Sequence, residues 1–448
     1  MKKNKKAFLI EFFSMAVPIM LQSLSGNILN LCDTLMVSQL SETAISGVTV
    51  ANKTFFIFHL VIFGASSGIS IFMAQYYGAK DKKSCRLAFG FGVRMCVGIA
   101  ILFTLFLLIA PKLVFTLYVK NGNTIETGLS YIKIVRFSYV PVAVNVMMAV
   151  YFRIHQKQNI PMYTGILSVA VNILFNYILI FGKLGAPRLE IRGAAFATLL
   201  SRILEMSMLL LLFCRYQKQE TGEKKKETMN WHMRGIMLRK ILPLIVNETV
   251  WAAALNMIFK NYCYVNETYI PAITVVDNIF DMVNVAFIGC STTAGIVMGK
   301  WLGANRLSEA KKISVRLIKI DLFVSVAVSL CVFFVAPYIP MLFALTGELL
   351  SVTTLLLRIK VLFTWTQGYG ETIYYILRAG GDTREVFLVD GLFMLLGPFL
   401  VSTLAARLTD WPLPYVYFCT EGIYLTKLFV TTCLYKKGKW IKNIAVRQ

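Results

Sequence analysis

The sequence predicts an all-α membrane protein in which twelve transmembrane helices form two parallel six-helix lobes around a central cavity. Three observations support this prediction: recurring apolar segments, the distribution of positive charge, and an internal repeat. Hydrophobic residues make up 57% of the 448 residues and charged residues only 15%, whereas soluble domains carry about 25% charged residues. This composition indicates that most of the chain lies in lipid.

Apolar segments recur along the chain, each long enough to cross a hydrocarbon core of roughly 30 Å. In the first half we expect spans near residues 8–36, 46–77, 88–110, 128–153, 161–182 and 193–214. In the second half we expect them near residues 238–262, 270–300, 314–343, 350–378, 386–406 and 413–435. The basic start followed by apolar residues could imitate a signal peptide. The run continues to Asp33 without a small-residue cleavage site, so we interpret it as a retained first helix.

The formal charge of +23 raises the question of a nucleic-acid partner, and its distribution answers it. The side of this topology that holds both termini and the even-numbered loops carries 32 Lys and Arg residues, and the other side carries 10. The remaining four lie inside spans. This asymmetry follows the positive-inside rule, so we expect a multi-pass protein of the inner cell membrane with both termini in the cytoplasm and no nucleic-acid partner.

The two halves of the sequence are copies of one unit. A shift of 225 residues superposes Pro18 on Pro243, Arg153 on Arg378, and residues 49–79 on 274–304, which are identical at nine of 31 positions. We therefore predict an N-terminal lobe at 1–214, a cytoplasmic connector at 215–237, a C-terminal lobe at 238–435 and a basic cytoplasmic tail at 436–448.

Each copy has an even number of spans, so both copies enter the membrane from the same side and their axis runs along the membrane normal. Secondary transporters use two such lobes for alternating access. Pro18 and Pro243 lie at matching places in the first span of each copy. Proline removes a helical hydrogen bond and bends the helix, so each could be a hinge or a static kink.

Among the carboxylates inside predicted spans, we single out five: Asp33, Glu248, Asp277, Asp281 and Glu371. A carboxylate at the bilayer centre costs roughly 2.5–3.5 kcal/mol on insertion scales, so each one needs a partner, water or a function. They could form a cation or proton site that lines a polar cavity and favours cationic substrates. Alternatively, they could be structural, either snorkelling to an interface or pairing with one of four basic residues: Lys53, Arg202, Lys260 or Arg378.

Two further pairs are expected to be structural. Glu205 lies one turn from Arg202 on the sixth predicted span, which suits an ion pair. Asp382 and Arg384 fall in a cytoplasmic loop, where we expect a solvated pair.

The sequence does not favour an enzyme. It has only three His residues, with no HExxH, no phosphate-binding GxxxxGK[ST] loop, and no CxxC among its nine cysteines. No resident metal or cofactor is expected. Without a nucleotide-binding loop, transport would have to be driven by an ion gradient or by the gradient of the substrate.

Over essentially its whole length the sequence resembles the multidrug and toxic compound extrusion (MATE) transporters. The resemblance rests on Pro18 and Gln22 followed by DTLMVSQL (33–40), on QYYGAKD (75–81), and in the second copy on GKWLGA (299–304) and LRAGGDTR (377–384). It implies an antiporter that exports organic compounds in exchange for protons or sodium ions. Small organic substrates and membrane lipid would then be its partners, with no cofactor beyond the coupling ion, and we expect a monomer.

The resemblance also implies a cation site in the first lobe. Asp33 matches the acidic residue of span one that is thought to drive rearrangement, and Thr198 is similar to a threonine that completes the site. Span five of the family often has Asn followed four residues later by Asp, whereas this sequence has Asn172 and Asn176. With one carboxylate left among Asp33, Asn172, Asn176 and Thr198, a proton is the more natural coupling ion than sodium.

The second lobe departs from the family pattern. Members with an ion site there carry a Glu about two turns beyond the proline, and Glu248 is one turn closer. Gln367 stands where those members have Asp, and Glu371 lies one turn further on. Coupling could rest on Glu248 with Asp277 or Asp281, or on Asp33 alone. The alternative function is a flippase for a lipid-linked precursor, which would need a cationic cavity for phosphate groups.

Overall fold

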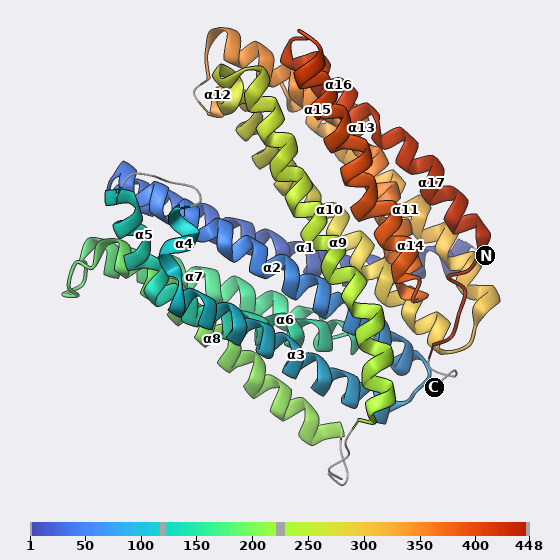
Figure 1. Cartoon of the computed structure of the whole chain (residues 1–448). Coiled ribbons are helices and arrows are strands. Elements are labelled where there is room, and N and C mark those ends of the chain that lie inside the picture. The colour runs from blue at the N-terminus through green and yellow to red at the C-terminus, as the bar shows by residue number, and fades with distance from the viewer. Residues whose placement is uncertain (1, 117–121, 221–228, 344, 445–448) are drawn as a thin grey trace. The chain divides into compact units, whose positions relative to one another are not determined.

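The computed structural model describes residues 2–116, 122–220, 229–343 and 345–444, and all regular secondary structure in these ranges is helical (Figure 1). The first half contains α1 (Lys2–Ser38), α2 (Glu42–Gly78), α3 (Lys82–Ile109), α4 (Pro111–Thr116), α5 (Gly122–Val135), η1 (Arg136–Ser138), α6 (Tyr139–Ile154), α7 (Asn159–Phe181) and α8 (Glu190–Glu220). The second half contains α9 (Trp231–Val265), η2 (Glu267–Tyr269), α10 (Ile270–Gly303), α11 (Leu307–Val335), α12 (Ile339–Leu342), α13 (Gly347–Ala379), α14 (Thr383–Phe387), η3 (Leu388–Leu392), η4 (Leu395–Phe399), α15 (Leu400–Leu408), α16 (Leu413–Gly422) and α17 (Tyr424–Lys437).

Among the described residues, eleven helical segments are long and apolar enough to cross a membrane, and each overlaps one of the predicted spans. The segment predicted as the twelfth span, residues 413–435, forms the two shorter helices α16 and α17, which adjoin at Ile423. The twelfth span, at residues 413–435, therefore stays a prediction. Pro18 lies inside α1 and Pro243 inside α9, in both cases without ending the helix.

The chain divides into two compact units. Unit 1 comprises Met1–Ala16, Ile71–Lys82 and Gly235–Gln448, and unit 2 comprises Val17–Ser70 and Lys83–Arg234. In unit 1, α13 packs against α10, α11, α16 and α17, and in unit 2, α8 packs against α5, α6 and α7. The division follows the two copies of the repeat, except that the first part of α1 and the end of α2 belong to unit 1.

Two glycines allow the ends of α2 and α10 to touch within unit 1. A Cβ atom on Gly78 would lie 2.0 Å from the main-chain oxygen of Lys300, and one on Gly303 would lie 1.9 Å from that of Gln75. The contact is reciprocal, because Gln75 and Lys300 are themselves related by the 225-residue offset. Such a pair of contacts is what a parallel repeat with a two-fold axis produces, and only glycine leaves room for it.

Replacing Gly303 by alanine should therefore destabilise the protein. The added methyl group must push main chain apart, at an overpacking cost of about 1–3 kcal/mol or more. Thermal unfolding of the purified protein in detergent measures the effect. Gly98→Ala on α3 is the matched control, because a Cβ there meets no atom within 4 Å. If both variants unfold at the temperature of the unchanged protein, α2 and α10 do not approach this closely.

The described part of the C-terminal tail, residues 438–444, is packed onto unit 1. Trp440 is 1% exposed and stacks on Tyr435 with ring centroids 5.6 Å apart. The side chain of Gln75 is fully buried: its Nε2 donates to the main-chain oxygen of Ala379 at 2.6 Å, and its Oε1 accepts from the main-chain nitrogen of Ile444 at 2.6 Å. The tail thus ties the end of α2 to the end of α13.

This packing overturns one expectation. The predicted solvated pair of Asp382 and Arg384 is wrong, because Asp382 is only 9% exposed and accepts a hydrogen bond from Lys442 Nζ at 2.6 Å. Arg384 is itself exposed. The tail supplies the partner from 60 positions further along the chain, which the local sequence around Asp382 does not reveal.

Candidate functional site

Asp33 lies near the end of α1 in unit 2, where it is 5% exposed. Its Oδ1 accepts a hydrogen bond from Asn176 Nδ2 on α7 at 2.5 Å, and its Oδ2 accepts one from Thr198 Oγ1 on α8 at 3.2 Å. Asn176 Nδ2 also donates to Asn172 Oδ1 at 3.0 Å. The structure therefore brings together the four residues that the resemblance connected, which we call the Asp33 cluster.

The packing of α7 against α8 creates this geometry. Asn172 and Asn176 are four residues apart and share one face of α7. At the start of α8, Gly193 lets the two helices approach, because a Cβ there would lie 2.5 Å from the main-chain oxygen of Leu179. Ser168 on α7 further links the helices by donating to the main-chain oxygen of Ser201 at 3.0 Å.

The Asp33 cluster has unused hydrogen-bonding capacity. Asn176 Oδ1 and Asn172 Nδ2 are buried and have no hydrogen-bond partner among the described residues. Buried polar atoms are rarely left in this state unless a water, an ion or a function occupies them. Asp33 itself makes no ion pair with any described residue and receives hydrogen bonds from neutral donors, while Arg202, which is paired with Glu205, acts on it electrostatically without contact.

Arg153 and Arg378 are related by the 225-residue offset, and each contacts the proline-bearing helix of its own copy. In unit 2, Arg153 donates to Gln22 Oε1 at 2.6 Å. In unit 1, the equivalent Arg378 lies 3.4 Å from Glu248 Oε1 and is 2% exposed. The structural alternative for Glu248, a pair with Arg378, is therefore the arrangement present, and its role in coupling stays a prediction.

A polar network surrounds this pair in unit 1. Tyr374 OH donates to Glu248 Oε1 at 3.0 Å, and the neighbouring Asn247 donates to Asp390 Oδ2 at 2.9 Å. Asp390 also pairs with Lys427 at 2.5 Å and lies on the π-helical turn η3. Such turns frequently occur at functional sites.

The other predicted cavity residues are spread over α10 and α13. Asp277 and Asp281 share an exposed face of α10, whereas Gln367 and Glu371 on α13 are half-buried. The predicted structural pair of Arg202 and Glu205 is confirmed, with Nη1 and Oε2 3.3 Å apart.

Three buried or half-buried carboxylates were not singled out by the sequence analysis. Asp390 and Glu421 are each paired with a lysine, Lys427 and Lys360 respectively. Asp321 on α11 is the third and makes no ion pair with any described residue. Each lies inside a predicted span, which was the available signal. Asp321 follows the basic start of its span, where a charge is easily taken for an interfacial residue.

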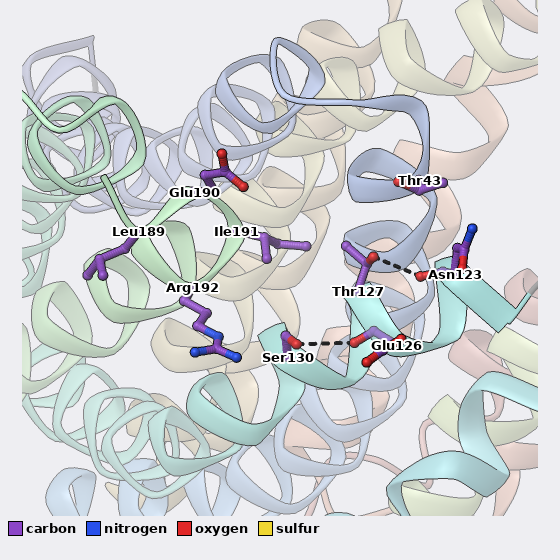
Figure 2. A pocket seen from close by; sticks show the side chains of 9 residues that line it. All are labelled: Thr43, Asn123, Glu126, Thr127, Ser130, Leu189, Glu190, Ile191 and Arg192. Atoms are coloured by element: carbon purple, nitrogen blue, oxygen red, sulfur yellow. Dashed lines mark hydrogen bonds between the residues drawn. The ribbon is translucent and has the colours of Figure 1, made fainter. Parts of the chain in front are cut away.

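A shallow pocket of about 460 Å³ lies in unit 2, away from these residues (Figure 2). Its lining comes from the start of α2, from α5 and from the segment that enters α8: Thr43, Asn123, Glu126, Thr127, Ser130, Leu189, Glu190, Ile191 and Arg192. Thr127 and Ser130 donate to main-chain oxygens of their own helix, as Figure 2 shows. The pocket contains none of the predicted site residues.

These features define a helical membrane protein built from two related copies, with a buried carboxylate in a span of unit 2 that forms no ion pair with any described residue. The chain belongs to the MatE family, whose model matches residues 18–178 and again residues 245–401. The two matches begin almost one repeat apart, so the family match independently supports the two copies.

Curated relatives match most of the chain. The "probable multidrug resistance protein NorM" of Thermotoga maritima is 21% identical over 381 residues, covering 85% of this chain and 82% of the relative. The "multidrug resistance protein MdtK" of Yersinia pestis is 22% identical over 419 residues, covering 90% and 88%.

Solved structures show the same fold at low identity. A MATE crystal structure described as the bent conformation has a TM-score of 0.86 and 18% identity, with 96% of each chain covered. A MOP superfamily transporter from Pyrococcus furiosus has a TM-score of 0.82 and 18% identity, covering 96% of this chain and 93% of that one. The latter is described as having a binding pocket of reversed polarity that suggests a different function.

Proposed function

We propose that this protein is a secondary active antiporter that exports organic compounds, preferentially cationic ones, in exchange for protons. Sodium is the alternative coupling ion. In this proposal twelve spans form two parallel six-helix lobes around a central cavity, and Pro18 and Pro243 serve as hinges. The protein acts as a monomer in the inner membrane with both termini in the cytoplasm, and it needs no cofactor.

The observation that carries the proposal is the state of Asp33. An ionised carboxylate in a membrane span is costly, and a salt bridge is the usual way to offset that cost. Asp33 makes no ion pair with any described residue, and its hydrogen bonds come from the neutral donors Asn176 and Thr198. A carboxylate held in this way can gain and lose a cation without breaking an ion pair, which is what a coupling site requires.

The donor set supports a proton over sodium. Sodium would need several oxygen ligands around one charge, whereas the amide of Asn176 presents its NH₂ group to Asp33. Asn172, Asn176 and Thr198 would then orient the carboxyl group and supply no second titrating group. Sodium binding would require the Asn176 amide to turn its unpartnered oxygen inward.

The exposed carboxylates support a cationic substrate. Asp277 and Asp281 share a face of α10 with Asn278 and Thr274, and all four are exposed. Carboxylates within a span do not face hydrocarbon, so this face should border a water-filled cavity. Glu371 and Gln367 on α13 are proposed to add to that lining. An acidic lining would repel the phosphates of a lipid-linked precursor, so no observation favours the flippase alternative. The names of the multidrug resistance relatives agree with export.

Efflux from proteoliposomes tests the proposal. With a fluorescent organic cation inside and an inward proton gradient imposed without sodium, we expect efflux well above that of protein-free liposomes. A sodium gradient alone should give none. Efflux driven only by sodium would overturn the proton assignment, and no gradient-dependent efflux of a panel of organic cations would overturn the antiport proposal.

Orientation in the liposomes needs its own control. Cys214, near the end of α8, is exposed and lies one residue before the segment predicted to be cytoplasmic. In a variant that retains only this cysteine, labelling by a membrane-impermeant thiol reagent reports the fraction of molecules whose cytoplasmic side faces outward. The same labelling in intact cells should fail, and success there would contradict the predicted topology.

A further inference from the structure

Asp321 is the least exposed carboxylate in the described part of the chain, with 1% of its surface accessible. It lies on α11 in unit 1. Its Oδ2 accepts hydrogen bonds from Thr372 Oγ1 on α13 and from Ser291 Oγ on α10, the latter at 3.4 Å. One carboxylate oxygen thus joins three helices.

Close packing of α11 against α13 delivers these donors. A Cβ on Gly368 would lie 1.8 Å from Ser325 Oγ, so only glycine allows the approach. Ser325 donates to the main-chain oxygen of Asp321 at 2.6 Å, and Thr372 lies one turn along α13 from Gly368. The site is therefore built into the helix packing and does not depend on a loop.

Other buried carboxylates of the described chain are neutralised in a different way. Four of them pair with a basic side chain: Glu205 with Arg202, Glu248 with Arg378, Asp382 with Lys442, and Glu421 with Lys360. Of the carboxylates that are less than 9% exposed or at that limit, only Asp33 and Asp321 lack such a partner among the described residues. The 225-residue offset places Cys96 opposite Asp321, so this carboxylate is not the repeat image of Asp33.

One oxygen of Asp321 remains available. Oδ1 is buried and has no hydrogen-bond partner in the described chain, and the same is true of Glu371 Oε2 on the adjacent face of α13. The two carboxylates lie close enough to repel each other when both are ionised. Two such like charges in a membrane interior are strongly unfavourable, and a bound proton removes one of them.

We propose that Asp321 is a second proton-binding site, located in unit 1, that binds and releases a proton at Oδ1 during the transport cycle. This proposal extends the proton-coupled antiport proposed above. Binding forms one O–H bond with a proton taken from water and moves no electrons. It also makes the carboxyl group a weaker acceptor for Thr372 and Ser291, so protonation loosens the junction of α10, α11 and α13.

The groups that face Asp321 are few. Cys290 and Ser291 come from α10, and Glu371 and Thr372 come from α13. On α17, which packs against α13, the charged Lys427 is already paired with Asp390. Cys290 and Glu371 are therefore the titratable side chains that face Asp321.

Infrared difference spectroscopy tests this inference without requiring transport. The purified full-length protein in lipid nanodiscs is compared at low and high pH, and the carboxyl C=O stretch of protonated side chains is recorded. We expect at least two bands that disappear as pH rises, of which Asp33→Asn removes one and Asp321→Asn removes another. The matched control is Glu421→Gln, since a carboxylate paired with Lys360 should contribute no band and its replacement should remove none.

A second variant covers the case in which Asp321→Asn does not fold. Thr372→Val keeps the carboxyl group but removes its closest donor, so the band of Asp321 should remain and shift in frequency. An unchanged set of bands in Thr372→Val, or in a folded Asp321→Asn, would overturn the proposal. The two proposals can fail separately. If the infrared bands respond as expected but the protein shows no ion-coupled efflux, the proton site at Asp321 is supported and only the antiport function is overturned.

Discussion

Asp33→Asn should abolish proton-driven efflux while leaving the protein inserted, folded and able to bind its substrate. The asparagine side chain has the shape of the protonated carboxyl group and can still accept the hydrogen bond from Thr198, but it cannot exchange a proton. Efflux from proteoliposomes under an imposed pH gradient should therefore fall to the level of protein-free liposomes. Binding of the fluorescent substrate to the purified variant should persist.

Asp410→Asn is the matched control for Asp33→Asn. Asp410 is an exposed carboxylate between α15 and α16, so the same substitution there should leave efflux unchanged. Normal transport by Asp33→Asn would assign Asp33 a structural role. Equal loss of transport and of substrate binding would mean that the residue contacts the substrate and is not limited to coupling.

Arg378→Met should cause the largest loss of stability of any single substitution considered. Arg378 is 2% exposed and Glu248 is 7% exposed, so removal of the arginine leaves a buried carboxylate without its cation. Breaking a buried pair in this way costs about 3–5 kcal/mol. The arginine also lies over the rings of Tyr374 and Tyr375, with its guanidinium carbon 4.8 Å and 5.5 Å from their centroids. Thermal unfolding in detergent measures the loss.

The repeat provides an internal control for this experiment. Arg153, the counterpart of Arg378, donates to the neutral Gln22 where Arg378 pairs with a carboxylate, so Arg153→Met should cost less than Arg378→Met. The double variant Glu248→Gln/Arg378→Met should recover part of the stability lost by Arg378→Met alone. If it does not recover, the charge of Glu248 is balanced by other groups. Efflux by Glu248→Gln then decides between a structural and a coupling role for this carboxylate.

Much of the architecture could be predicted because it depends on local and periodic properties of the sequence. Apolar length alone located eleven of the helices that are able to span a membrane. The repeat offset anticipated the equivalence of Arg153 and Arg378, both of which hold the proline-bearing helix of their own copy. Composition could not decide whether residues 413–435 form one span, because the break between α16 and α17 involves no proline or charge pattern that signals it.

The polar sites were harder to predict, because their partners come from distant parts of the chain. Asp33 and Thr198 are separated by 165 positions, and only the resemblance to a known family connected them. Asp382 was misassigned because Lys442 reaches it from the tail. Asp321 was overlooked although it lies within a predicted span, since nothing in its neighbourhood of KISVRLIKID indicates that Thr372 and Ser291 will meet it.

The position of Gln75 has a consequence for biosynthesis. This side chain is translated with the second helix, but its amide bonds the main chain of Ala379 and of Ile444, which is added 369 positions later. A buried amide that lacks its partners costs about 1–3 kcal/mol. The packing at the end of α2 is therefore incomplete until the second copy of the repeat has been synthesised. A chain that stalls before residue 444 lacks the main-chain donor for Gln75 Oε1, so it lacks one of the two hydrogen bonds that fix this buried amide at the end of α2.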